Sequence, residues 1–72
     1  MTPEDLKIAS NKSNWRITQL PNQYYQTEYF NSMDEWIPVT RRKSVEAAED
    51  AIDNSIEYFS RKLNGKTVVK RF

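Results

Sequence analysis

Cysteine and histidine are both absent from the 72 residues of this chain. Without cysteine the fold can contain neither a disulfide nor a thiolate zinc site. Without histidine the chain lacks the side chain that most often serves as an acid or base near neutral pH and as a ligand of transition metals. These two absences argue against an enzyme, and we expect no catalytic, cofactor-binding or metal-binding residues.

Glycine and long apolar runs are also scarce. Gly65 is the only glycine of the chain, which excludes the glycine-rich loops of the Walker and dinucleotide-binding motifs. No apolar run approaches the roughly 18 residues of a membrane span. The opening MTPEDLKIAS lacks the basic and apolar regions of a signal peptide. We therefore expect a soluble, cytoplasmic protein without a membrane partner.

What the chain does contain is enough apolar surface for one small domain. It has two tryptophans, four tyrosines and three phenylalanines, and a folded chain of this size buries only about 60% of its unfolded surface. The formal net charge is +1, which is too small to predict nucleic-acid binding by itself. The distribution of the charges is therefore more informative than their sum.

Three β-strands are predicted in the first half of the chain. A two-residue alternation carries Trp15 and Ile17, QYYQTEYF at 23–30 is rich in tyrosine and threonine, and EWIPVT at 35–40 is the third segment. LPNQ and NSMD supply the turns between them. Because Pro38 cannot donate a ladder hydrogen bond, the third strand is predicted to be an edge strand or locally bulged.

One register of this meander gives it a consistently apolar face, and a slip by one residue would exchange the two faces. The face that we assign to the core carries Trp15, Ile17, Tyr25, Thr27, Tyr29, Ile37 and Val39. The opposite, outer sheet face carries Arg16, Thr18, Leu20, Tyr24, Gln26, Glu28, Phe30, Trp36 and Pro38. Each later assignment of a side chain to core or surface depends on this register.

The second half of the chain is dominated by a predicted amphipathic helix. Ser44 is a favourable N-cap, and Gly65 follows where a left-handed C-terminal cap is usual. Between them the apolar residues recur at three- and four-residue spacing: Val45, Ala48, Ile52, Ile56, Phe59 and Leu63. KTVVKRF at 66–72 is predicted to be a short strand that pairs with either free edge of the sheet.

These elements predict an α+β domain of the order β-β-β-α-β over residues 14–72. A three- to four-stranded antiparallel sheet packs on one long amphipathic helix. Residues 1–13 are predicted to form a short helical turn or a frayed tail, because Thr2 and Pro3 favour a helix start but isolated helices this short are marginal. We therefore expect a single domain with a short N-terminal extension.

The outer sheet face is one candidate surface for a partner. The aromatic residues Tyr24, Phe30 and Trp36 are predicted to lie together there, near Arg16 and the triplet Arg41, Arg42 and Lys43. Exposed aromatics mark protein interfaces and also stack on nucleic-acid bases. The same face could instead be covered by the first ten residues or by a second copy of the chain.

The helix is the other candidate surface, because it carries a line of carboxylates about 16 Å long. These acids are Glu46, Glu49, Asp50, Asp53 and Glu57. Acids near a helix N-terminus complement the macrodipole. The line is therefore explained either by helix stability or by a basic partner.

The order of elements also resembles a known DNA-binding family. Three strands, a helix beginning SVEAAEDAID and a basic end NGKTVVKRF are similar to the plant-type AP2 DNA-binding domain over roughly residues 14–72. This resemblance implies contact between the sheet and DNA, to which Arg16 and Trp36 would contribute. The helix here looks about one turn longer than in that family, and the sheet lacks the family's dense arginines and paired tryptophans.

Three hypotheses of function follow from these surfaces. The leading one is a small non-catalytic regulator or inhibitor that binds a protein partner through the aromatic sheet face, the acidic helix or both. The alternative is a DNA- or RNA-binding module that uses Arg16, Arg41, Arg42 and Lys43 and whose affinity falls steeply with salt. The third is a homo-oligomer whose sheet edges or outer faces pair.

Overall fold

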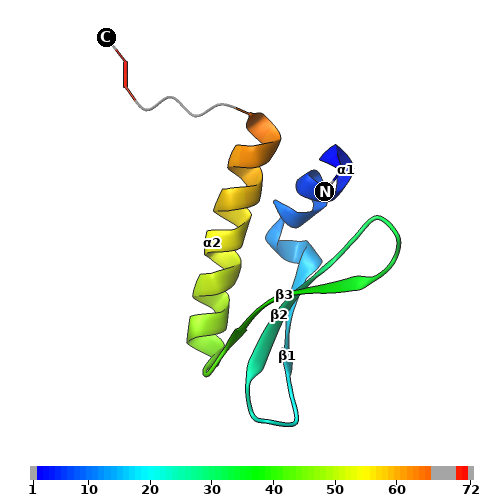
Figure 1. The fold of residues 1–72 in the computed structure, drawn as a ribbon, viewed down its shortest axis with the longest axis vertical. Coiled ribbons are helices and arrows are strands. Elements are labelled where there is room, and N and C mark those ends of the chain that lie inside the picture. Colours follow the sequence, from blue (N-terminus) through cyan, green and yellow to red (C-terminus); the bar gives the residue numbers. More distant parts are fainter. Residues whose placement is uncertain (1, 66–69, 72) are drawn as a thin grey trace.

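The computed structural model describes residues 2–65 and 70–71. Along the chain it contains helix α1 (Pro3–Ala9), a 3₁₀ helix (Lys12–Asn14), strands β1 (Trp15–Gln19), β2 (Tyr25–Phe30) and β3 (Trp36–Arg42), and helix α2 (Val45–Asn64). The strands form an antiparallel sheet in the order β1-β2-β3, and α2 packs against one face of it (Figure 1). The predicted α+β fold is confirmed, whereas the strand predicted at 66–72 falls mostly outside the described residues.

Aromatic side chains from the sheet and α2 form the centre of the core. Trp15 is 8% exposed, and its ring centroid lies 5.4 Å from that of Tyr29 and 6.3 Å from that of Phe59. Ile52 of α2 and Ala9 of α1 complete the buried cluster. The partly buried aliphatic side chains packed against it are Ile17, Ile37 and Ile56. The sheet face that was predicted to form the core is therefore the face that contacts α2.

Helix α1 is packed on this core. Its last residue, Ala9, is fully buried, and the indole Nε1 of Trp15 donates a hydrogen bond of 2.8 Å to the Ala9 carbonyl oxygen. Nearer its start, the Asp5 carboxylate accepts hydrogen bonds from the backbone N–H (3.1 Å) and the hydroxyl (2.8 Å) of Ser32 in the β2–β3 turn. The hydrogen bonds from Ser32 lower the pKa of Asp5. Of the two expectations for residues 1–13, the short helix is confirmed.

Strand β3 departs from the predicted strand in length and in regularity. It continues through Arg42 instead of ending at Thr40, and its pairing with β2 shifts by one residue after Pro38. Val39 is the extra residue of this β-bulge, which has no partner opposite it. Val39 is 37% exposed, so its predicted burial in the core is wrong. Thr40 takes the inward place, where its hydroxyl oxygen lies 2.6 Å from that of the buried Thr27.

Both hairpin turns contain a residue in the left-handed region of backbone conformation. Gln23 has a φ of 73° and Asp34 a φ of 59°. Each residue's N–H donates to a carbonyl three residues back, at Leu20 (3.0 Å) in the first turn and at Asn31 (3.3 Å) in the second. Aspartate tolerates this conformation better than glutamine does. The backbone strain is therefore greater at Gln23.

Replacing Gln23 by glycine is expected to raise the free energy of unfolding by about 0.5–1 kcal/mol. The left-handed conformation costs a residue with a side chain roughly 1–2 kcal/mol, and glycine avoids this cost. The gain exceeds the free-energy cost of the extra backbone entropy that glycine loses on folding. The Gln23 side chain accepts only one hydrogen bond, of 3.1 Å, from the Gln19 amide. Urea unfolding followed by circular dichroism measures the change. Asp34→Gly is the control and should gain less; a less stable Gln23→Gly would contradict the argument.

Candidate functional site

The outer sheet face presents an aromatic and cationic group, Arg16, Phe30 and Trp36, which we call the Trp36 cluster. The centroids of the Trp36 and Phe30 rings lie 5.1 Å apart, and the guanidinium carbon of Arg16 lies 3.9 Å from the Trp36 ring centroid. Trp36 remains 37% exposed. Trp36 and Phe30 are paired directly across β3 and β2, whereas Arg16 reaches Trp36 from β1. The structure thus brings three of the residues selected from the sequence into contact.

Glu28 holds the polar side chains beside this cluster. Its Oε1 accepts hydrogen bonds from Arg16 Nε (2.7 Å) and Thr18 Oγ1 (2.8 Å), and its Oε2 accepts one from Gln26 Nε2 (2.7 Å). Glu28 itself is only 7% exposed. Arg16 is therefore fixed twice, by a charge-assisted hydrogen bond and by stacking on the Trp36 ring.

These contacts also set the ionisation of Glu28. Burial opposes charge on its carboxyl group, but the hydrogen bonds from Arg16, Thr18 and Gln26 outweigh burial and lower the pKa of Glu28 from its ordinary value of 4.5. Glu28 is therefore a carboxylate at neutral pH, and both of its oxygens are occupied. Its role in the outer sheet face is to position Arg16.

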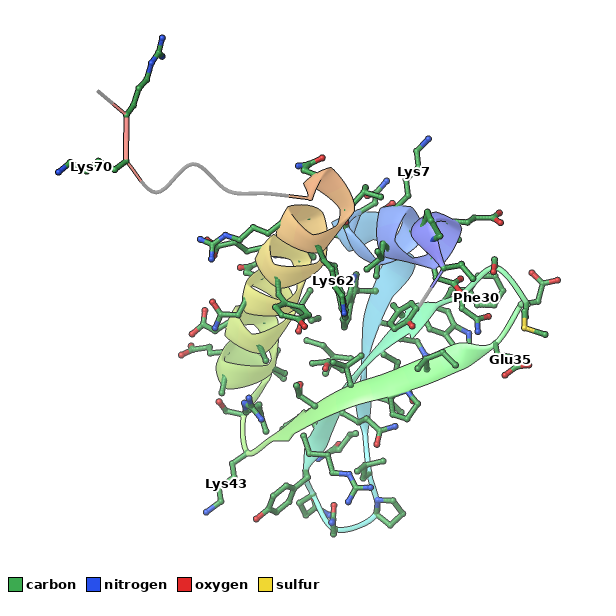
Figure 2. All side chains as sticks on the ribbon, turned by 45° about the horizontal axis from the view of Figure 1, so that its top comes forward. Lys7, Phe30, Glu35, Lys43, Lys62 and Lys70 are labelled. Atoms are coloured by element: carbon green, nitrogen blue, oxygen red, sulfur yellow. The ribbon has the colours of Figure 1, made fainter. Side chains whose placement is uncertain are left out.

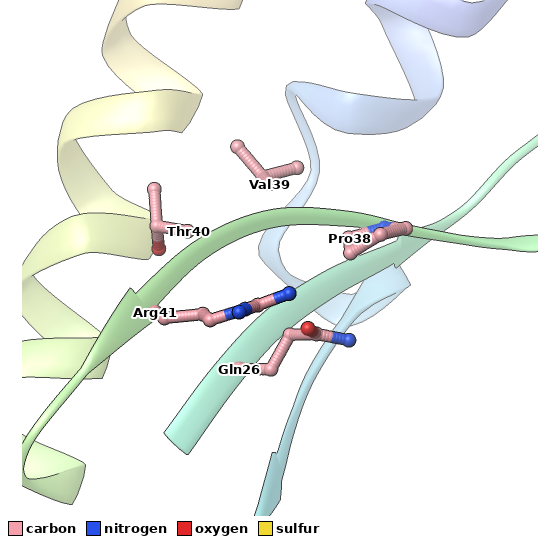
Figure 3. Close-up of a pocket in the computed structure, with 5 residues that line it drawn as sticks. All are labelled: Gln26, Pro38, Val39, Thr40 and Arg41. Carbon is pink, nitrogen blue, oxygen red and sulfur yellow. The ribbon is translucent and has the colours of Figure 1, made fainter. Parts of the chain in front are cut away.

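The bulge in β3 adds Arg41 to the same face. In a regular strand, residue 41 would point toward α2, because successive side chains alternate between the faces. After the extra residue, Arg41 instead pairs with Gln26. Figure 3 shows Arg41 and Gln26 on one side of β3 and Val39 on the other. Gln26 and residues 38–41 line an open pocket of about 250 Å³.

The three consecutive cations that follow Thr40 do not form one patch. Arg41 lies on the outer sheet face, whereas Arg42 pairs with Tyr25 and lines a hollow of about 310 Å³ between β3 and α2. Lys43 lies just beyond the end of β3 (Figure 2). The cluster predicted from the sequence is therefore divided between two faces and a strand end, because side chains of a strand alternate.

Tyr24 is separated from the other outer aromatics. It precedes β2, whereas Phe30 ends that strand, and six residues of strand span roughly 20 Å. Figure 2 shows Phe30 near Glu35 at one end of the sheet. Tyr24 is 37% exposed at the opposite end. The predicted group of three outer aromatics therefore reduces to Phe30 and Trp36.

The acidic side of α2 is distinct from the outer sheet face, because α2 packs on the opposite face of the sheet. All five predicted acids are exposed: Glu46, Glu49, Asp50, Asp53 and Glu57. Lys12 forms an ion pair of 3.0 Å with Asp53, and the hydrogen bond and charge of Asp53 raise the pKa of Lys12. Arg61 pairs with Glu57 one turn away. Cations of this chain therefore neutralise part of the acidic line; helical spacing predicts the pair of Glu57 with Arg61 but not that of Asp53 with Lys12.

Sequence reasoning places Glu28 and Gln26 on the outer sheet face but assigns them no role. A signal for Glu28 is present in the predicted faces, because Arg16 and Glu28 share the outer one; the structure pairs them directly across β1 and β2, where opposite charges attract. The contact between Arg16 and Trp36 has no such signal. It depends on the side-chain conformation of an arginine that reaches across an intervening strand.

The described part of the chain holds no group of three or more side chains suited to a metal ion. None of its described helices is long and apolar enough to cross a membrane. No family model, no curated protein and no solved structure matches the chain. The resemblance to AP2 domains therefore rests on the order of the elements alone.

Proposed function

We propose that this chain is a small non-catalytic regulator or inhibitor that binds a protein partner through its outer sheet face. The observation that carries the proposal is the exposed Trp36, whose ring contacts both the Phe30 ring and the guanidinium of Arg16. Tryptophan and arginine are among the residues that most often dominate the binding energy of protein interfaces. We place its action in the cytoplasm, in keeping with a chain that has no cysteine.

The order within the Trp36 cluster supports this proposal. Arg16 is held by Glu28 and stacks on Trp36, so its long side chain is already restricted before a partner binds. Immobilising such a side chain at an interface costs about 0.5–1.5 kcal/mol when the fold has not done so. When an apolar side chain of a partner packs on Trp36, Arg16 therefore loses little further side-chain entropy, because folding has already restricted it.

A nucleic-acid module is favoured less by this geometry. The triplet Arg41, Arg42 and Lys43 is split between surfaces, so its charges cannot follow one phosphate backbone together. Asp34 and Glu35 lie in the turn that leads into Trp36, where their negative charge would repel phosphates. A protein partner is the better match to a face that combines aromatic, cationic and neutralised acidic groups.

The test is the capture of host proteins on the immobilised chain, with wild type and Trp36→Ala compared in parallel. The extract of the native host is treated with nuclease and bound at 0.15 M salt, and the retained proteins are quantified by mass spectrometry. We expect at least one protein to be retained by wild type and reduced tenfold or more on Trp36→Ala. Truncation of a hot-spot residue costs about 2 kcal/mol or more, which corresponds to that reduction.

Tyr58→Ala is the matched control for this capture. Tyr58 is also an exposed aromatic, at 59%, and also has a cation near its ring, with Lys62 Nζ 5.7 Å from the centroid, but it lies on α2. We expect Tyr58→Ala to retain the same proteins as wild type. Equal retention by Trp36→Ala and wild type, or no protein retained by wild type, would show that the proposal is wrong.

A further inference from the structure

We infer that the outer sheet face binds an acidic segment of its partner, whose carboxylates pair with Arg16 and Arg41 while an apolar side chain of the segment rests on Trp36 and Pro38. This inference rests on the proposed function and specifies the chemistry of the partner. It follows from the donors, the charge balance and the spacing of the two arginines.

Both arginines have hydrogen-bond donors available. Arg16 uses its Nε for Glu28, which leaves the two terminal nitrogens of the guanidinium for a ligand. The Arg41 side chain makes no hydrogen bond or ion pair with any described residue, and its backbone carbonyl accepts a hydrogen bond from the Arg42 side chain. A guanidinium binds a carboxylate through two parallel hydrogen bonds. Each arginine can therefore donate hydrogen bonds to one carboxylate of a ligand.

The charges of the outer sheet face are not balanced within it. Glu28 on the central strand β2 is the acidic residue of this face, and its two oxygens already accept three hydrogen bonds. Two arginines thus face one carboxylate, which is occupied by Arg16. The uncompensated positive charge is at Arg41, beside the pocket that it forms with Gln26 and Pro38. Charge complementarity favours a ligand carboxylate at this position.

The spacing of the arginines suits a peptide. Arg16 is paired with Glu28 and Arg41 with Gln26, so they are two strands and two residues apart. With about 4.8 Å between strands and 3.3 Å per residue, their Cα atoms are separated by roughly 12 Å. An extended peptide covers this distance in about four residues. Acidic side chains at positions i and i+4, which share one face of an extended segment, therefore match the two arginines.

Nucleic acid and a second copy of this chain are the other sources of negative charge. A duplex needs a row of cations along its backbone, whereas this face offers two guanidinium groups and is bordered by Asp34 and Glu35. A second copy would offer the acids of its α2, but two of these, Asp53 and Glu57, already pair with Lys12 and Arg61 of their own chain. An acidic segment of a protein partner needs only the two guanidinium groups, and Arg41 lies five residues along β3 from Trp36, away from the turn that holds Asp34 and Glu35.

The experiment is the selection of a random dodecapeptide library on the immobilised full chain, followed by fluorescence anisotropy of the recovered peptides at 0.15 M salt. We expect these peptides to be enriched in aspartate or glutamate together with a large apolar residue. Arg41→Ala is expected to weaken their binding about tenfold or more, because a hydrogen bond between charged groups is lost. Arg42→Ala is the matched control: it removes the neighbouring arginine, which pairs with Tyr25 and lies toward α2, and should change binding less than twofold.

Several outcomes would overturn the inference. These are the recovery of no peptides or of peptides without acidic enrichment, and equal effects of Arg41→Ala and Arg42→Ala. Displacement of a labelled peptide by a 20-base-pair DNA duplex at a lower concentration than by the unlabelled peptide would assign the face to nucleic acid. Equally potent displacement by the unlabelled chain, with a molar mass that rises with concentration, would assign it to a second copy.

The host partner separates this inference from the proposed function. If the protein captured through Trp36 binds Arg41→Ala as tightly as wild type, the inference of an acidic segment is wrong and the proposed function stands. If capture does not depend on Trp36, the proposed function is wrong even where acidic peptides bind through Arg41.

Discussion

Trp15→Ala is expected to remove a large part of the protein's free energy of unfolding. Trp15 is the largest side chain of the buried cluster, contacts the rings of Tyr29 and Phe59, and donates a hydrogen bond to the Ala9 carbonyl oxygen. Truncating a buried tryptophan costs about 3–5 kcal/mol, whereas a domain of 72 residues is stable by roughly 4–11 kcal/mol in total. The midpoint of thermal unfolding, followed by circular dichroism, should fall by about 15 °C or more.

The second tryptophan of the chain provides the control. Trp36→Ala removes one ring contact and one cation–π contact from a half-exposed site, so we expect a loss of about 1–2 kcal/mol. The loss of stability in Trp15→Phe should lie between those of Trp15→Ala and Trp36→Ala. This variant keeps a ring but leaves the Ala9 carbonyl oxygen without its donor. Equal destabilisation by Trp15→Ala and Trp36→Ala would contradict the assignment of inner and outer faces.

Glu28→Ala is expected to lower the free energy of unfolding by about 1.5–3 kcal/mol at neutral pH, the range for hydrogen bonds to a charged group. The variant removes the acceptor shared by Arg16, Thr18 and Gln26, and with it the carboxylate that positions Arg16. Urea unfolding measures the loss. Glu57→Ala is the matched control, because it breaks the exposed ion pair with Arg61 on α2. We expect this control to cost no more than about 0.5 kcal/mol.

The difference between wild type and Glu28→Ala should also depend on pH. The pKa of Glu28 is lower in the folded protein than its ordinary value of 4.5, so its charge stabilises the fold fully above that value. This contribution is lost as the pH falls through the lower, folded pKa. The two proteins should therefore differ most in stability above pH 4.5 and converge as the pH falls through the lower, folded pKa of Glu28. A difference that stays constant over this range would contradict the role given to the carboxylate.

Most of the fold is predictable because its patterns are local. Alternation marks the strands, and apolar spacing marks α2, where the Ser44 hydroxyl accepts the predicted capping hydrogen bond from the Ala47 N–H at 3.1 Å. The two faces follow from the need for one apolar face, which correctly places Trp15, Tyr29 and Ile37 together; the structure pairs Tyr29 with both of the others. Through Pro38, the paired strand residues lie on their predicted faces.

The remaining features depend on contacts between distant parts of the chain. The TPED start predicts a helical turn, but its packing depends on the bond between Trp15 and Ala9 and on the contact between Asp5 and Ser32. Proline at position 38 suggests a bulge without fixing which residue is the extra one. The candidate site shares this limit, because the shared face of Arg16 and Glu28 follows from alternation while the outward position of Arg41 requires the bulge.

The bulge makes the length of the segment between Pro38 and Ser44 as important as its composition. A related chain with the same number of residues but no bulge would follow plain alternation from the proline and turn the arginine equivalent to Arg41 toward α2. A chain that lacks only the residue equivalent to Val39 would also alternate plainly, but it would keep that arginine on the outer sheet face. The number of residues between the proline and the arginine, counted without a bulge residue, therefore predicts which relatives can present two arginines on one surface.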